Sequence, residues 1–121
     1  MNNEEFKIKF KKRLYKFTLN LLKYIDKLKK DSITNRISDQ LIRSGTSIIA
    51  NFVEGQASSS RKEFINYMHI SLKSCNESKL WLSLLKDSGK ADKGETDILL
   101  NELIETGKII ASIILSSKGK K

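Results

Sequence analysis

The chain contains no proline, and its 121 residues include only six glycines. A β-rich fold of this length would need many turns, and turns recruit proline and glycine. Long helices joined by a few short loops therefore suit this chain better. Its length corresponds to one domain. We predict an all-α protein with a single domain over residues 1–121.

Apolar residues recur at helical spacing in four segments, at about residues 4–30, 36–54, 61–88 and 93–117. Capping signals support these limits: Ser38 and Gly55 for the second segment, Ser60 and Gly89 for the third, and Asp92 for the fourth. Similar lengths and short loops predict an up-down-up-down antiparallel four-helix bundle. The expected core positions are Phe10, Leu14, Phe17, Leu21, Tyr24, Leu28, Phe64, Met68, Leu72, Cys75, Leu82, Leu85, Leu99, Leu103, Ile110 and Ile114.

The second segment is unusual because residues 31–60 contain no lysine, although most of the 23 basic residues are lysines. It has apolar residues on two sides: Leu41, Ile48 and Phe52 on one, and Ile42, Ile49 and Val53 on the other. A helix that is apolar over most of its circumference is buried on more than one side. We therefore expect it to lie between its own bundle and a second copy of the chain. The first segment also has a stripe that one buried face does not require, formed by Ile8, Tyr15 and Leu22.

Polar residues form a stripe along the second segment, at steps of three or four: Gln40, Arg43, Ser47, Asn51 and Glu54. If a second copy covers this stripe, Arg43 needs a carboxylate partner, because an unpaired buried charge is very costly. Glu54 and Glu77 are the candidates. The alternative is that the stripe is the solvent face of an ordinary bundle helix.

The positive charge is concentrated in the first segment. The chain has a net charge of +9, and residues 1–30 hold ten Lys or Arg against three acidic residues. Such a surface favours polyanionic partners, nucleic acid above all. The predicted contacts are Lys9, Lys12, Arg13, Lys16, Lys23 and Lys27. The alternative is that these residues serve only solubility and helix formation.

The sequence shows no catalytic, cofactor or metal site. The only histidine, His69, and the only cysteine, Cys75, cannot supply the three or four ligands of a zinc site. No apolar run reaches the ~18 residues of a membrane span, and the N-terminus lacks the apolar core of a signal peptide. We expect a cytoplasmic protein that is not an enzyme, uses no cofactor and has no membrane partner.

The segment from Gln40 to Leu82 reads QLIRSGTSIIANFVEGQASSSRKEFINYMHISLKSCNESKLWL. It resembles bacterial four-helix-bundle proteins encoded in intervening sequences of 23S ribosomal RNA genes. Their pattern is Q-L-x-R-A-A-x-S-I-P-x-N-I-A-E-G, followed after a short loop by S-x-x-E-F and G-S-x-x-E. Ile49 stands where the family usually has proline, so we expect a straighter helix here. The matching positions are Gln40, Arg43, Ser47, Asn51, Glu54, Gly55, Ser60, Glu63, Phe64, Ser74 and Glu77.

That family is similar to the accessory proteins of diversity-generating retroelements, which are basic pentameric barrels that bind nucleic acid and a reverse transcriptase. The resemblance implies a homo-oligomer, a pentamer by this likeness, without catalytic residues. Together with the charge, it predicts a non-enzymatic assembly that binds structured RNA or DNA through a basic surface. The alternative is an adaptor that docks a partner protein and has no nucleic-acid role.

Overall fold

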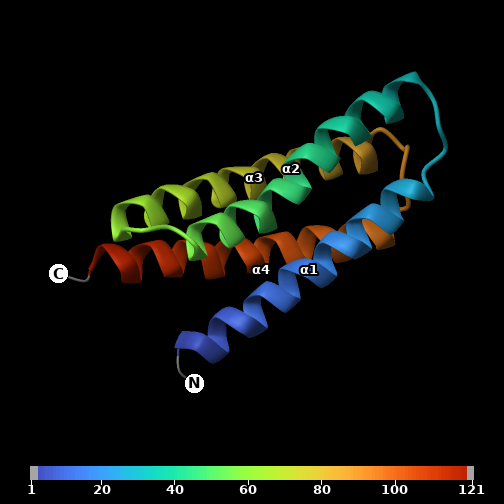
Figure 1. The fold of residues 1–121 in the computed structure, drawn as a ribbon. Coiled ribbons are helices and arrows are strands. Elements are labelled where there is room, and N and C mark those ends of the chain that lie inside the picture. The colour runs from blue at the N-terminus through green and yellow to red at the C-terminus, as the bar shows by residue number, and fades with distance from the viewer. Residues whose placement is uncertain (1–2, 120–121) are drawn as a thin grey trace.

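The computed structural model describes residues 3–119, which form four helices: α1 (Asn3–Asp26), α2 (Ser32–Gln56), α3 (Arg61–Asp87) and α4 (Lys93–Lys118). Figure 1 shows that each helix runs back along the one before it, joined by short connections at the two ends. The predicted all-α, up-down-up-down antiparallel four-helix bundle is confirmed. α2 also continues unbroken through Ile49, the position where the family pattern has proline.

The core follows the predicted periodicity. All the expected core residues are buried except Leu28, Phe64 and Leu72, which are half-buried and pack against the core. Leu28 lies beyond the end of α1, which is shorter than predicted and ends at Asp26. Phe10 packs edge-on against Phe52 of α2, with ring centroids 5.1 Å apart. Aromatic contact thus joins α1 to α2 within the core.

The start of α2 differs from the prediction. Asp31, not Ser38, is the N-cap, because its side chain accepts a hydrogen bond of 2.8 Å from the amide of Thr34. Asp31 also forms an ion pair of 3.0 Å with Lys90, which lies between α3 and α4. The Thr34 amide and then the Lys90 ammonium lower the pKa of Asp31 to about 2. Ser38 instead lies inside the helix and is buried.

Gly55 does not end α2 as predicted, since the helix continues to Gln56 and Ala57 is its C-cap. The glycine instead permits close packing on α3: a Cβ atom here would lie 2.8 Å from Met68 Cε and 3.2 Å from Tyr67 Cβ. The other capping predictions are confirmed. Ser60 accepts from the amide of Glu63, Asp92 accepts from that of Glu95, and Gly89 follows α3 with a φ of +76°.

Two helical glycines should respond oppositely to alanine. At Gly45 a Cβ atom would lie 2.2 Å from Cδ2 of the buried Leu21, so Gly45→Ala should destabilise the fold by about 1–3 kcal/mol, as overpacked cores do. At Gly107 it would meet Leu72 Cδ1 at 3.8 Å and Cys75 Sγ at 3.9 Å, which are ordinary contacts. Gly107→Ala should therefore stabilise α4 by about 0.5–1 kcal/mol. Urea unfolding of both variants tests this difference.

The bundle is not equally closed along its length. Near the end of α1, the Tyr24 hydroxyl bonds Thr96 of α4 at 2.8 Å, and Lys27 forms an ion pair with Glu95. Toward its N-terminus, α1 diverges from the C-terminal part of α4, as Figure 1 shows. A cavity of about 750 Å³ lies at this end of the bundle. We call it the end cleft.

Candidate nucleic-acid interface and assembly surface

Four of the six predicted nucleic-acid-binding residues form an exposed line along α1. They are Lys9, Lys12, Lys16 and Lys23, which we call the cationic face. Their spacing of three, four and seven residues places them on one side of the helix, away from the buried Phe10 and Phe17. None of the four has an ion pair within residues 3–119. Their charges are therefore available to an outside anion.

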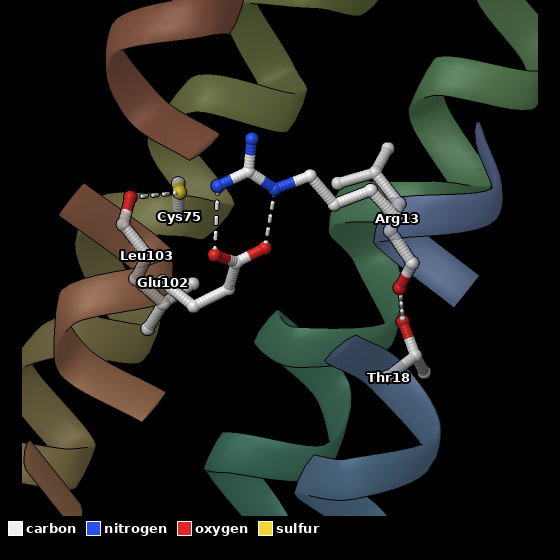
Figure 2. Close-up of polar contacts among 6 residues, drawn as sticks. Arg13, Thr18, Cys75, Glu102 and Leu103 are labelled. Carbon is white, nitrogen blue, oxygen red and sulfur yellow. Dashed lines mark hydrogen bonds and ion pairs between the residues drawn. The ribbon is translucent and has the colours of Figure 1, made fainter. Parts of the chain in front are cut away.

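Arg13 and Lys27 are also exposed, but acidic residues of α4 balance their charges. Figure 2 shows Arg13 facing the Glu102 carboxylate with two nitrogens, Nε at 2.7 Å and Nη2 at 2.9 Å. This hydrogen bonding raises the pKa of Arg13. Lys27 forms its ion pair with Glu95. These two residues hold α1 against α4, and they add less free positive charge to the surface than the sequence predicts.

We use the name polar seam for the five residues of the predicted polar stripe together with Glu77 of α3. The five stripe residues on α2 are Gln40, Arg43, Ser47, Asn51 and Glu54. Its central part connects the two helices within one chain. The Ser74 hydroxyl donates to Ser47 Oγ at 2.9 Å, and the Asn51 amide donates to both the hydroxyl and the carbonyl of Ser47 at 2.8 Å. Ser47 and Asn51 thus have a structural role, and Gln40 is half-buried at the edge of the seam.

The charged residues of the seam are exposed in the single chain. Arg43 has no ion pair within the described residues, and Glu77 accepts a hydrogen bond of 3.0 Å from the Trp81 indole. Eleven residues separate Arg43 from Glu54, about 16 Å along one helix, so these two cannot pair within α2. A pair between Arg43 and Glu54 therefore requires a second copy of the chain.

The two unexplained apolar stripes come together on one side of the bundle. One flank of α1 faces α4 through Arg13 and Tyr24, and one flank of α2 faces α3 through Ser47. The stripes lie on the opposite flanks, which both border the groove between α1 and α2. All but the half-buried Ile49 are at least 38% exposed. This apolar face consists of Ile8, Tyr15 and Leu22 of α1 with Ile42, Ile49 and Val53 of α2.

A comparison with protein families shows to which family the chain belongs. The sequence model described as 23S rRNA-intervening sequence protein matches residues 7–112, which covers nearly all of the bundle. The chain belongs to this family. It is also similar to the 1.70 Å crystal structure of a protein of unknown function from the S23 ribosomal protein family of Bacteroides thetaiotaomicron VPI-5482. That similarity has 32% identity and a TM-score of 0.78, and it covers 87% of this chain and 97% of the other. A search of curated proteins gives no match.

The residues that carry the pattern of the intervening-sequence family differ in the contacts that they make within the chain. Five of the eleven positions that carry the family pattern form two groups in this structure. Ser74 donates to Ser47 between α3 and α2, and Asn51 donates to Ser47 within α2, whereas no ion pair among residues 3–119 involves Arg43 or Glu54. The first group is explained by the fold of one family member. The second group is exposed in the single chain.

Sequence reasoning missed the acidic partners on α4. Glu102 pairs with Arg13 of α1 and Glu95 pairs with Lys27 just after it, and the local sequence around these two cations carries no signal of either pair. The predicted buried character of Cys75 is confirmed: burial raises the pKa of its thiol to about 11, and its Sγ donates to the Leu103 carbonyl at 3.4 Å (Figure 2). The thiol is thus protonated at neutral pH and is not a reactive thiolate.

Within residues 3–119 no group of three or more His, Cys, Asp or Glu is placed to hold a metal ion. Over the same residues, no helix is both long enough and apolar enough to cross a membrane.

Replacing Arg43 by alanine should separate folding from assembly. Because the side chain is exposed and has no ion pair with another described residue, Arg43→Ala should change the free energy of unfolding of the single chain by less than about 0.5 kcal/mol. If Arg43 pairs with a carboxylate of a second copy, the same change should lower the stability of the assembly by roughly 3–5 kcal/mol. Urea unfolding at several protein concentrations distinguishes the two, since only the second effect depends on concentration.

Proposed function

We propose that this protein is a non-enzymatic homo-oligomer, acting in the cytoplasm, that binds RNA or DNA through the cationic face of α1. The observation that carries the proposal is the line formed by Lys9, Lys12, Lys16 and Lys23, which are all exposed and have no acidic partner in the described chain. Ammonium groups in such a line neutralise successive phosphates of a nucleic-acid backbone.

Contacts of this kind are made to phosphates, so they carry little sequence information. Lysine supports this interpretation, because it acts as a compact point charge rather than as a planar fork that reads a base edge. The expected activity is therefore broad binding of structured RNA or DNA, with affinity set by charge. Several copies in one assembly would present several cationic faces to one nucleic acid and raise the total affinity.

Assembly is the second part of the proposal. The apolar face supports it, because its isoleucine, valine, leucine and tyrosine side chains would be better buried than left in water. The position of the apolar face on the bundle also matters. It lies at the groove between α1 and α2, whereas the lysines of the cationic face lie on the side of α1 away from the buried Phe10 and Phe17. Copies joined through the apolar face would leave the cationic face open to solvent. We take five copies as the working number from the resemblance to retroelement accessory proteins.

Salt dependence of RNA binding tests the proposed function. Four phosphate contacts on a single strand give a slope of log K against log salt of about −2.8, so raising salt from ~50 to ~200 mM should weaken binding about fifty-fold. The measurement is fluorescence anisotropy of a labelled generic RNA with the full-length protein. A loss of less than tenfold, or no binding at ~50 mM salt, would remove the nucleic-acid role.

The competing function is an adaptor that docks a partner protein. It is favoured by the same apolar face, which would suit a foreign protein surface as well as a second copy. Light scattering discriminates between them, because an adaptor that reserves this face for a partner would remain a single chain when pure. The lysines of α1 would then contribute solubility only.

A further inference from the structure

The end cleft is a feature that neither the proposed RNA binding nor the proposed assembly uses. Its volume of about 750 Å³ falls within the range of about 300–1,000 Å³ that small-molecule sites occupy. The first turns of α1, the end of α2, the start of α3 and the last turns of α4 surround it. It exists because α1 diverges from α4 at this end of the bundle (Figure 1).

The floor of the cleft is apolar and partly aromatic. All four helices contribute to it, through Phe6, Phe52, Phe64, Ile109 and Ile113. Phe52 is fully buried and held in place by the edge of Phe10, so this part of the floor is rigid. The other four side chains are half-buried and pack against the core on one side only. An aromatic or aliphatic group of a ligand would cover the sides that remain open.

The rim of the cleft is cationic. Lys7, Arg61 and Lys108 line it, and no Asp or Glu belongs to the described residues that do. Lys7 lies 3.6 Å from Glu4 and Lys108 lies 3.9 Å from Glu105, each one helical turn away in exposed pairs. Exposed pairs of this kind contribute little and exchange easily for a better anion. Serine hydroxyls add polar groups to the lining, at positions Ser58, Ser59, Ser60, Ser112, Ser116 and Ser117.

We propose that the end cleft binds a small amphipathic anion, with an apolar or aromatic body on the phenylalanine floor and a carboxylate, sulfonate or phosphate at the cationic rim. A wholly apolar ligand would make no use of the rim lysines Lys7 and Lys108, and a simple inorganic anion would leave the floor open to water. The start of α3 lies at the same rim, and its helix dipole also favours negative charge there. The proposal does not depend on RNA binding, since none of the residues that line the cleft belongs to the cationic face.

Two related dyes test the proposal. 1-Anilinonaphthalene-8-sulfonate and N-phenyl-1-naphthylamine share one aromatic framework, and only the first carries a negative charge. In fluorescence titrations of the full-length protein, the double variant Lys7→Glu with Lys108→Glu should bind the sulfonate at least tenfold more weakly and the neutral dye unchanged. Ser112→Trp, which places an indole in the cleft from an exposed position, should weaken binding of both dyes.

Two matched controls make the result decisive. Lys73→Glu with Lys93→Glu changes the net charge equally at exposed positions outside the cleft, and it should leave the sulfonate affinity as in the wild type. If this control loses affinity to the same extent, or if the rim variant loses none, the proposed site is wrong. If Ile42→Lys abolishes dye binding while Ser112→Trp does not, the dye binds the apolar face and the proposal fails. If Ser112→Trp instead breaks the oligomer in light scattering, a second copy occupies the cleft and the proposal also fails.

Discussion

Ile42→Lys should convert the assembled protein into smaller species at micromolar concentration. In the single chain Ile42 is 38% exposed, so a lysine can reach water there and the bundle itself should still fold. In an assembly that covers the apolar face, the same lysine would place an unpaired ammonium in an apolar contact, which costs several kcal/mol. Size-exclusion chromatography with light scattering measures the change in mass.

A matched control uses the same substitution on another helix. Ile98 of α4 is 70% exposed and lies outside the apolar face, so Ile98→Lys should leave the mass of the wild-type assembly unchanged. Ile49→Lys should also disrupt assembly, but Ile49 packs against the core, so its unfolding curve is needed as well. A wild-type protein that is a single chain at these concentrations would contradict the interface. Equal disruption by Ile98→Lys would mean that another face makes the contact.

The number of helices and most of the core could be predicted because helical periodicity is a local property of the sequence. Phe10, Leu14 and Phe17 are buried as their spacing requires. The start of α2 could not be predicted in this way, because several residues after position 30 are good N-caps. The choice of Asp31 depends on contacts with Thr34 and with Lys90, and Lys90 is 59 residues away in the sequence.

The candidate site shows the same division between local and long-range information. The line of lysines on α1 is visible in the sequence, since it depends on spacing along one helix. The sequence does not show that ion pairs neutralise Arg13 and Lys27, because these pairs depend on how α4 is rotated against α1. The apolar face has a similar origin: each stripe is evident from sequence, but their position on both sides of one groove follows from the packing of α1 on α2. The end cleft has no sequence signal at all.

Reversing two charges of the cationic face should abolish most RNA binding. Lys12→Glu with Lys16→Glu removes two phosphate contacts and introduces two repulsions, so affinity at ~50 mM salt should fall at least tenfold, and the salt slope should lose about 1.4 on a single strand. Arg13 is left unchanged in this variant because a glutamate there would face Glu102 and detach α1 from α4. Anisotropy with a labelled generic RNA measures the affinity, and light scattering checks that the assembly is intact.

The control for this variant is again Lys73→Glu with Lys93→Glu. It lowers the net charge by the same amount as Lys12→Glu with Lys16→Glu, but on α3 and α4. If binding depends on the position of the lysines, this control should retain at least half of the wild-type affinity, because its lost charges lie off the cationic face. If both double variants lose affinity equally, the nucleic acid responds to overall charge and no face of α1 is special. If neither does, the lysines of α1 serve solubility, and the exposed apolar face becomes the feature that explains what this family member binds.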